Sequence, residues 1–451
     1  MGTCSMQAQV NNDDDDEDYK EDDEVTVTNQ QGQEEQIELP EAMTYEIDSL
    51  LHLYNVKTSL KVDSTCDLPD VNPVYSKDEI VARLKMLPTA IEMPYNDVVQ
   101  KMIDRYSGRL RHSVSYMLGA QNFYMPIFEE ALESYGLPLE LKYLPIIESA
   151  LNPRAVSRVG ATGLWQFMIT TGKRYGLLVN SLVDERRDPV KSSYAAAHYL
   201  SDLYNIFGDW DLVIAAYNCG PDNVRKAIHR SNGEKDYWKI YPYLPAETRG
   251  YVPAFIAANY IMNFYCDHNI CPMLTDLPAK TDTVVVNRDV HFEQVSNVLG
   301  IDIDQLKDLN PQYRRSVVNG NNRPMALRLP ASYISQYIEK EDSIYAYDAD
   351  RLLSKRDEVD VNDDEPTVNR VRRSARSRSY SKKSRSSRRS SSRSSRKSRS
   401  SKKTSSKSVT IKSGDTLSEI AERNHTTVKK LKKLNNISGS SIRAGKKIKV
   451  K

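Results

Sequence analysis

The sequence predicts a mainly α-helical protein with small α+β modules and disordered linkers. Three observations lead to this prediction. Apolar residues recur at helical spacing between residues 95 and 275, a strand–helix–helix–strand pattern occurs twice after that region, and two strongly charged segments lack the apolar residues that a core needs. The chain of 451 residues has room for two or three domains, although a hydrophobic content of 39% indicates that part of it forms no core.

The two ends of the chain differ in charge, which the net charge of +2 conceals. Residues 1–40 contain the acidic run DDDDEDYKEDDE and almost nothing to bury, so we expect this segment to be disordered. Residues 41–94 are expected to form an extended or partly helical lead-in.

No run of about 18 or more apolar residues is present, and the first ten residues lack the pattern of a signal peptide. The chain is therefore expected to be soluble, and either cytoplasmic or exported with a signal that is not in this sequence. Its five cysteines are an odd number. Cys266 and Cys271 can form a local disulfide or remain free thiols, and with His268 they supply too few ligands for a closed zinc site. We therefore predict no metal.

Residues 95–275 are predicted to form one helical domain. Gly136 ends one helix, and Pro138 suits the first turn of the next, which runs to Glu148. Apolar residues at helical spacing mark two earlier helices, through Val98, Val99, Met102, Ile103 and Tyr106, and through Phe123, Ile127, Phe128, Ala131 and Leu132. Further helical patterns cover residues 192–207, 211–217 and 251–260.

An internal repeat follows the helical domain, since residues 284–310 align without a gap to residues 409–435. In the second copy, Thr416 and Glu419 form a capping box at the start of a helix. The apolar positions of the two copies coincide, pairing Val286 with Ile411, Phe292 with Leu417, Val295 with Ile420, Ile303 with Val428, Leu306 with Leu431, and Leu309 with Leu434.

The first copy differs at one turn, where Asp289 and Val290 replace Gly414 and Asp415. We expect the same fold there, with an altered binding loop. Between the copies, residues 350–407 form a Ser/Arg/Lys-rich segment that is predicted to be a disordered linker. Because no RNA-recognition module accompanies this segment, we interpret it as a solvated tether without a specific nucleic-acid partner.

Glu148 is the candidate catalytic residue. It ends an apolar helix, where loss of water beside Ile147 and Leu151 and the negative end of the helix dipole are both expected to raise its pKa. A carboxylic acid that keeps its proton near neutral pH can protonate a glycosidic oxygen. On Glu148 alone, an ordinary charged residue at a helix end is the better interpretation.

The residues that follow reverse that preference, because hydroxyl, amide and phenol groups that can orient a sugar occur at regular points of the domain. They occur in the stretches ESALNPRAVSRVGATGLWQFM, AAYNCGPDNV and LPAETRGYVP. In chain order, the polar residues and glycines of interest in these stretches are Ser157, Gly160, Gly163, Gln166, Tyr217, Asn218, Glu247, Arg249 and Tyr251.

Together these motifs resemble the lytic transglycosylases of the soluble lytic transglycosylase (SLT) type, most closely the membrane-bound lytic murein transglycosylase D subgroup. The resemblance implies a lysozyme-like helical catalytic domain at 95–275, a degenerate LysM-like module at 281–345, and a LysM domain at 408–451 recognised through SGDTLSEIA and LNN. It also implies cleavage of peptidoglycan without a cofactor.

Carried over position by position, the resemblance makes Glu148 the catalytic acid and base. Trp165 and Met168 fit core packing or substrate contact equally well. The positions that match substrate contacts are Ser157, Gln166, Met168, Tyr217, Asn218 and Glu247. The expected glycan contacts of the LysM domain are Gly414, Asp415, Thr416 and Asn435.

The implied reaction cleaves the β-1,4 bond between N-acetylmuramic acid (MurNAc) and N-acetylglucosamine (GlcNAc) without water and leaves 1,6-anhydroMurNAc ends. Two alternatives remain. A goose-type lysozyme would need a second carboxylate, for which Glu247, Asp184 and Asp188 are candidates, and a non-catalytic scaffold would only bind the cell wall.

The implied substrate places the protein in the cell envelope, in the periplasm or at the outer membrane, with Cys4 as a candidate lipidation site. The expected partners are peptidoglycan strands, GlcNAc-containing glycan at the LysM domain, and anionic envelope groups at the basic linker.

Overall fold

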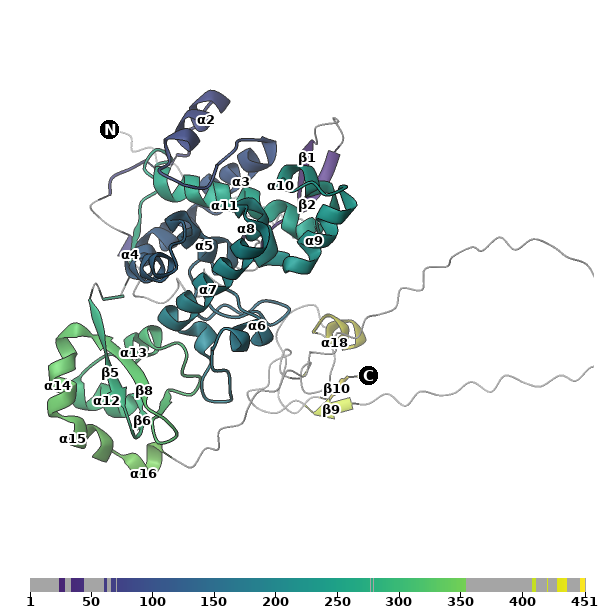
Figure 1. Cartoon of the computed structure of the whole chain (residues 1–451). Helices are drawn as coiled ribbons and strands as arrows, with labels where there is room; N and C mark the ends of the chain where they lie inside the picture. Colours follow the sequence, from purple (N-terminus) through teal and green to yellow (C-terminus); the bar gives the residue numbers. More distant parts are fainter. Residues whose placement is uncertain are drawn as a thin grey trace, which may run out of the picture. The chain divides into compact units, whose positions relative to one another are not determined.

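The computed structural model (Figure 1) describes two compact units, one within Met1–Asn369 and one within Arg370–Lys451, and each is described by itself. The described residues are 24–28, 34–43, 61–62, 66–69, 71–275, 277–278, 280–353, 408–410, 420, 428–435 and 447–450. The expected linker at 350–407 lies mostly outside them. Within this part of the chain, no helix has both the length and the apolar composition needed to cross a bilayer.

The helical domain of the first unit is assembled around α11 (Ala246–Phe264), which is buried along most of its length. This architecture confirms the predicted mainly helical fold. The helices that pack against α11 are α3 (Asp97–Ser107), α4 (Arg111–Ser134), α5 (Leu144–Ser149) and α8 (Trp210–Cys219). The other elements are α2 (Lys77–Met86), α6 (Ile169–Arg174), η3 (Glu185–Arg187), α7 (Pro189–Phe207), α9 (Pro221–Arg230), α10 (Tyr237–Ile240) and η4 (Tyr241–Tyr243).

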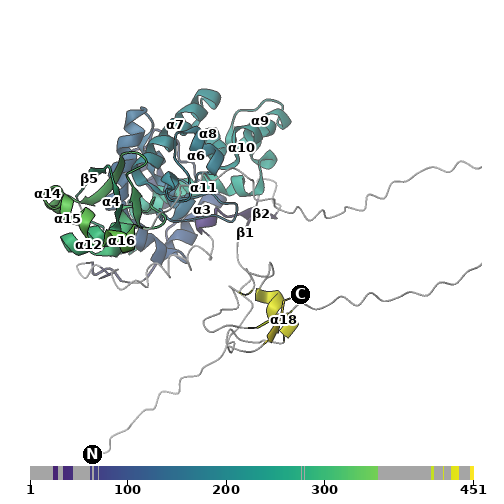
Figure 2. The same cartoon turned by 90° about the horizontal axis from the view of Figure 1, so that it is seen from below.

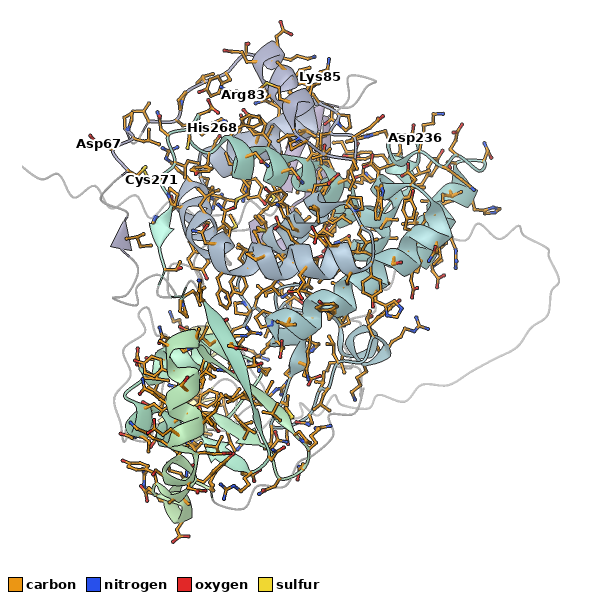
Figure 3. All side chains as sticks on the ribbon, turned by 60° about the vertical axis from the view of Figure 1, so that its left-hand side comes forward. Asp67, Arg83, Lys85, Asp236, His268 and Cys271 are labelled. Carbon is orange, nitrogen blue, oxygen red and sulfur yellow. A yellow bond between two sulfur atoms is a disulfide. The ribbon has the colours of Figure 1, made fainter. Side chains whose placement is uncertain are left out.

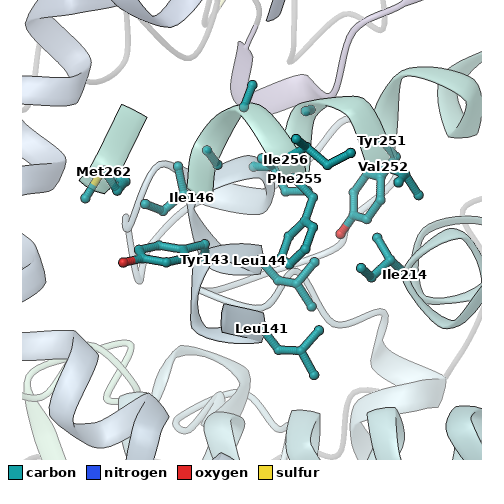
Figure 4. Close-up of a cluster of buried hydrophobic side chains, with 14 of the residues drawn as sticks. Leu141, Tyr143, Leu144, Ile146, Ile214, Tyr251, Val252, Phe255, Ile256 and Met262 are labelled. Atoms are coloured by element: carbon teal, nitrogen blue, oxygen red, sulfur yellow. The ribbon is translucent and has the colours of Figure 1, made fainter. Parts of the chain in front are cut away.

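The helix expected from Pro138 to Glu148 is instead two elements, the 3-10 helix η2 (Leu139–Tyr143) and α5. Pro145 explains the division, because it has no amide hydrogen to continue the helical hydrogen bonding. Figure 4 shows how the apolar side chains of η2, α5 and α11 form one cluster, in which Leu141, Leu144, Ile146 and Phe255 are buried.

An N-terminal hairpin corrects the expectation that residues 1–40 are disordered. The strands β1 (Glu24–Thr28) and β2 (Glu34–Glu38) pair antiparallel and lie beside α3 and α11 (Figure 2). Val27 and Ile37 are buried there, at 2% and 0% exposure. Gly250 of α11 permits the close approach, since a Cβ at this position would lie 2.6 Å from the carbonyl oxygen of Glu38. The rest of the acidic segment lies outside the described residues.

The lead-in at 41–94 contributes η1 (Glu41–Met43), β3 (Lys61–Val62), which pairs with β4 (Met273–Leu274), and α2. It also decides between the alternatives left open for Cys266 and Cys271, because Cys271 forms its disulfide with Cys66 and leaves Cys266 as an exposed free thiol. The β3–β4 pairing brings the segment of Cys66 beside that of Cys271, although the two are distant in sequence.

His268 lies in the same region (Figure 3) and is a buried structural residue. Its ring nitrogens lie 3.0 Å from Asn72 Oδ1 and 3.1 Å from the Tyr260 hydroxyl. Burial and the nearby charge of Arg83 lower the pKa of His268 to about 4, so the imidazole is neutral at physiological pH.

The first repeat copy is an α+β module in which β5 (Thr281–Val286) pairs antiparallel with β8 (Met325–Pro330). The helices α12 (Phe292–Leu299) and α13 (Ile303–Leu309) lie between these strands in sequence, as predicted. Additional elements are the paired strands β6 (Asp289–His291) and β7 (Val317–Asn319), with η5 (Ala331–Tyr333), α14 (Ile334–Glu339), α15 (Glu341–Ala346) and α16 (Ala349–Leu352) after β8.

The second unit contains β9 (Ser408–Thr410), α18 (Val428–Asn435) and β10 (Lys447–Lys449), with β9 and β10 antiparallel. Both copies use the same asparagine contact. Asn435 Nδ2 donates to Lys449 O and its Oδ1 accepts from Lys449 N, at 2.8 and 2.7 Å. Asn310 makes the equivalent pair with Arg328, at 2.8 Å each, which confirms the repeat in three dimensions.

The Gly250→Ala substitution tests the packing of the hairpin on α11. Alanine is favoured over glycine in a helix by about 1 kcal/mol, so α11 alone would gain stability. The steric clash of the added methyl group with the Glu38 carbonyl outweighs this gain. We therefore expect the free energy of unfolding, measured by chemical denaturation, to fall by about 1–3 kcal/mol. Glu34→Gln on the exposed face of the hairpin is the control and leaves stability unchanged. A stabilised Gly250→Ala variant would contradict this packing.

Candidate active site

A cavity of about 330 Å³ in the helical domain brings together Glu148 and all six residues predicted to contact substrate. Residues from α5, α8, α11 and the loop before α6 line it. The predicted residues in its wall are Glu148, Ser157, Gln166, Met168, Tyr217, Asn218 and Glu247.

Glu148 is half-buried near the end of α5, where the chain turns sharply. Ala150 and Leu151 adopt left-handed backbone conformations with φ of 48° and 60°, and their amides donate to the carbonyls of Ile146 and Pro145. This turn ends the helix directly after the carboxylate. The side chain of Glu148 thus lies in the cavity wall while the rest of α5 stays in the core.

Tyr251 holds the Glu148 carboxylate, because its phenol donates a hydrogen bond to Glu148 Oε1. Burial and the charge of Glu148 raise the pKa of Tyr251 well above its usual range, so the phenol keeps its proton at neutral pH. The sequence motif included Tyr251, but the residue was not among the predicted contacts. Its spacing of four residues from Glu247 on α11 is the signal that places both on one helix face.

The loop that carries Gln166 is closed by its own backbone and side chains. Gln166 has φ of 46°, and its Nε2 donates to Gly163 O at 2.8 Å and to Ala155 O at 3.3 Å. Ser157 Oγ accepts a hydrogen bond from the amide of Ala161 at 3.0 Å. These contacts indicate that Ser157 and Gln166 shape the cavity wall as well as facing the space that it encloses.

Of the two residues with an open interpretation, Trp165 is only 1% exposed and its indole donates to Ser193 Oγ at 2.9 Å. It is mainly a core residue. Met168 is 40% exposed and lies in the cavity wall, which fits a substrate contact.

The end of α8 supplies Tyr217 and Asn218. The Tyr217 phenol donates to Trp165 O at 2.8 Å, and burial together with the charge of Glu148 raises its pKa well above the usual range. Asn218 Oδ1 accepts from the hydroxyl of Thr248 at 2.7 Å. Its orientation is therefore set by a residue of α11 that lies beside Glu247.

Of the three candidates for a second carboxylate, only Glu247 lines the cavity. Loss of water around the carboxylate and the charge of Glu38 raise the pKa of Glu247, while its interaction with Asn218 opposes this shift. Asp184 is fully buried in ion pairs with arginines, and Asp188 caps α7 through the amides of Val190 and Lys191.

Tyr199 and Pro40 are among the residues of the cavity wall that were not predicted. Tyr199 belongs to α7, and Pro40 follows the N-terminal hairpin. The sequence carries no local signal for Pro40, because its place depends on the packing of β2 against α11.

The predicted glycan contacts of the second unit remain predictions. Gly414, Asp415 and Thr416 lie outside the described residues. Both ends of the Asn435 amide bind the backbone of Lys449, and Asn435 Nδ2 also donates to Leu431 O. These contacts indicate a structural role for Asn435, the same as that of Asn310 in the first copy.

Comparison with protein-family models gives three matches. Residues 125–240 match the transglycosylase SLT domain, residues 280–346 match the lytic transglycosylase MltD LysM-like domain, and residues 409–451 match the LysM domain.

Curated relatives are similar over part or most of the chain. Membrane-bound lytic murein transglycosylase D of Escherichia coli (strain K12) is 29% identical over 360 residues, covering 79% of this chain and 69% of the relative. Soluble lytic murein transglycosylase of the same organism is 34% identical over 143 residues, covering 30% of this chain and 21% of the relative.

Among solved structures, the 70 kDa soluble lytic transglycosylase SLT70 from Escherichia coli aligns with 31% identity and a TM-score of 0.28, over 33% of this chain and 25% of that chain. The family matches cover the helical domain that holds the cavity and both copies of the repeat. The chain therefore contains a transglycosylase SLT domain, followed by a lytic transglycosylase MltD LysM-like domain and a LysM domain.

Proposed function

We propose that this protein cleaves the β-1,4 bond between MurNAc and GlcNAc in peptidoglycan without water and leaves 1,6-anhydroMurNAc ends. The observation that carries the proposal is the position of Glu148, half-buried in a polar cavity and held by the phenol of Tyr251. The family match of residues 125–240 agrees with this activity.

In the first step, Glu148 acts as a general acid and protonates the bridging oxygen, so that the bond to the MurNAc anomeric carbon breaks. The N-acetyl group of the substrate stabilises the positive sugar carbon, as the family resemblance implies. A single protein carboxylate is then sufficient for this step.

In the second step, the Glu148 carboxylate takes the proton of the MurNAc C6 hydroxyl, whose oxygen bonds to the anomeric carbon and closes the anhydro ring. The proton lost in the first step is thereby replaced from the same sugar, and no water is consumed. Tyr251 supports both steps by holding Oε1 in place without losing its own proton.

Substrate binding is assigned to the other polar groups of the cavity, with Asn218 positioned by Thr248. The LysM domain at 408–451 is proposed to bind GlcNAc-containing glycan, with Gly414, Asp415 and Thr416 as its candidate contacts. The basic linker is proposed to contact anionic envelope groups in a manner that weakens with ionic strength.

The proposed location is the cell envelope, in the periplasm or at the outer membrane, because peptidoglycan lies outside the cytoplasmic membrane. The Cys66–Cys271 disulfide supports an oxidising compartment. The curated relatives carry the names membrane-bound and soluble lytic murein transglycosylase, and Cys4 remains the candidate lipidation site.

A hydrolase of the goose-type lysozyme class is the second candidate function, since Glu247 lines the same cavity as Glu148. In that reaction the second carboxylate would activate a water molecule, and the product would carry a reducing MurNAc end.

The Glu148→Gln variant is expected to clear purified sacculi about 10²- to 10⁴-fold more slowly, because the amide can neither give nor take the proton. Its binding to sacculi, measured by sedimentation, is expected to be unchanged. Mass spectrometry of the wild-type digest is expected to show anhydro-ended muropeptides.

Glu247→Gln separates the two candidate reactions. The lyase retains formation of anhydro ends in this variant, at a rate reduced by weaker binding. Reducing ends in the wild-type digest, lost together with activity in Glu247→Gln, would contradict the lyase and favour the hydrolase. Unchanged clearing of sacculi by Glu148→Gln would contradict both reactions and favour the non-catalytic scaffold that only binds the cell wall.

The Tyr251→Phe variant removes the hydrogen bond to Glu148 and keeps the ring in the core. We expect kcat to fall by about 10- to 100-fold with little change in KM, because a catalytic group that shifts by about 1 Å loses rate on this scale. Tyr204→Phe, on the partly exposed face of α7, is the matched control. Equal activities of the two variants would show that Tyr251 does not position Glu148.

A further inference from the structure

We propose that the LysM-like module contributes to catalysis, because its residue Arg314 positions the loop that lines the cavity. The module belongs to the same compact unit as the helical domain. The inference rests on the proposed function, since it assigns a role in that reaction to a residue outside the catalytic domain. The family match describes the module only as LysM-like.

The first step of the argument is the contact between the two parts. Leu182 and Val183 extend from the helical domain and are buried in the core of the module, at 5% and 0% exposure. Around them the backbones are paired, since Asp184 N donates to Gln312 O and Arg314 N donates to Leu182 O, both at 2.9 Å. This pairing fixes Arg314 relative to Asp184.

The second step is a buried charge cluster at this contact. The Asp184 carboxylate is fully buried and accepts two hydrogen bonds from Arg186, at 2.9 and 2.8 Å. Arg314 of the module donates a third, at 2.7 Å. The two guanidinium groups lower the pKa of Asp184 despite its burial, so it is ionised at neutral pH. A buried carboxylate that loses one of these partners is poorly compensated, and the remaining pair shifts.

The third step leads from the cluster to the cavity. Arg186 Nη1 donates to the carbonyls of Gly160 and Phe167, both at 3.0 Å, and thereby ties together the two ends of the cavity loop. The loop also lies directly against the Arg186 backbone, because a Cβ at Gly163 would be 1.9 Å from Arg186 O. Between these points lies Gln166, which lines the cavity.

The altered turn of the first repeat copy agrees with a structural role for the module. The position that aligns with Gly414 is Asp289, which starts β6 and pairs with Asn319 of β7. Its Oδ1 accepts a hydrogen bond from Asn321 N at 3.0 Å. The position where the second copy has its predicted glycan contacts is thus part of the antiparallel β6–β7 pair here.

The test compares Arg314→Ala with Asp308→Ala in the full-length protein. Asp308 forms an ion pair across the same contact, with Arg154 at 3.0 Å. For Arg314→Ala we expect kcat on soluble glycan strands to fall about 10-fold or more with KM nearly unchanged. Asp308→Ala is expected to keep the wild-type kcat, and Arg314→Lys is expected to recover part of it by restoring the charge without the planar fork.

Hydrogen exchange of the amides at 160–167 provides a readout that does not depend on activity. We expect faster exchange there in Arg314→Ala than in Asp308→Ala, with similar exchange in α11. If Arg314→Ala does not fold, Arg314→Lys takes its place and is expected to show the same changes at smaller size.

Equal kcat values and equal loop exchange in Arg314→Ala and Asp308→Ala would overturn the inference, as would a change in KM alone. Failure of the proposed function has a different signature, because the wild-type protein itself would then release no anhydro-ended product.

Discussion

The structure depends on one constraint. The carboxylate of Glu148 must reach the cavity while the helix that carries it, α5, stays packed in the core. A helix of six residues is too short to be stable alone. It persists because Leu144, Ile146 and Ile147 are buried against α11, and because Ser149 donates its hydroxyl to Leu164 O at 2.9 Å. The packing of α5 in the core therefore fixes the backbone position of Glu148.

The polar groups around Glu148 are each held by a second contact. Tyr217 binds the backbone of Trp165, Asn218 accepts from Thr248, and Gln166 binds carbonyls of its own loop. Groups that are fixed in this way lose little freedom when a substrate binds, so the cavity is largely preorganised. The same principle extends outward from the loop through buried charges to the neighbouring module.

Much of this organisation could be predicted from the sequence, because helical periodicity and the motif around Glu148 are local signals. The features that were missed depend on distant partners. The hairpin is stabilised by Ile37 packing at Gly250, although acidic residues around Ile37 suggest disorder. The partner of Cys271 could not be inferred from spacing. The bonds between the Asn435 amide and the backbone of Lys449 likewise depend on a strand that follows later in the sequence.

The disulfide between Cys66 and Cys271 spans 205 residues of sequence. The enclosed stretch contains Glu148, Gln166, Tyr217 and Tyr251, so the catalytic chain is a covalent ring. A protease that cuts one peptide bond inside this ring releases no fragment, because the two pieces remain joined through sulfur. A single nick inside the ring thus leaves all four of these residues in one covalently linked molecule.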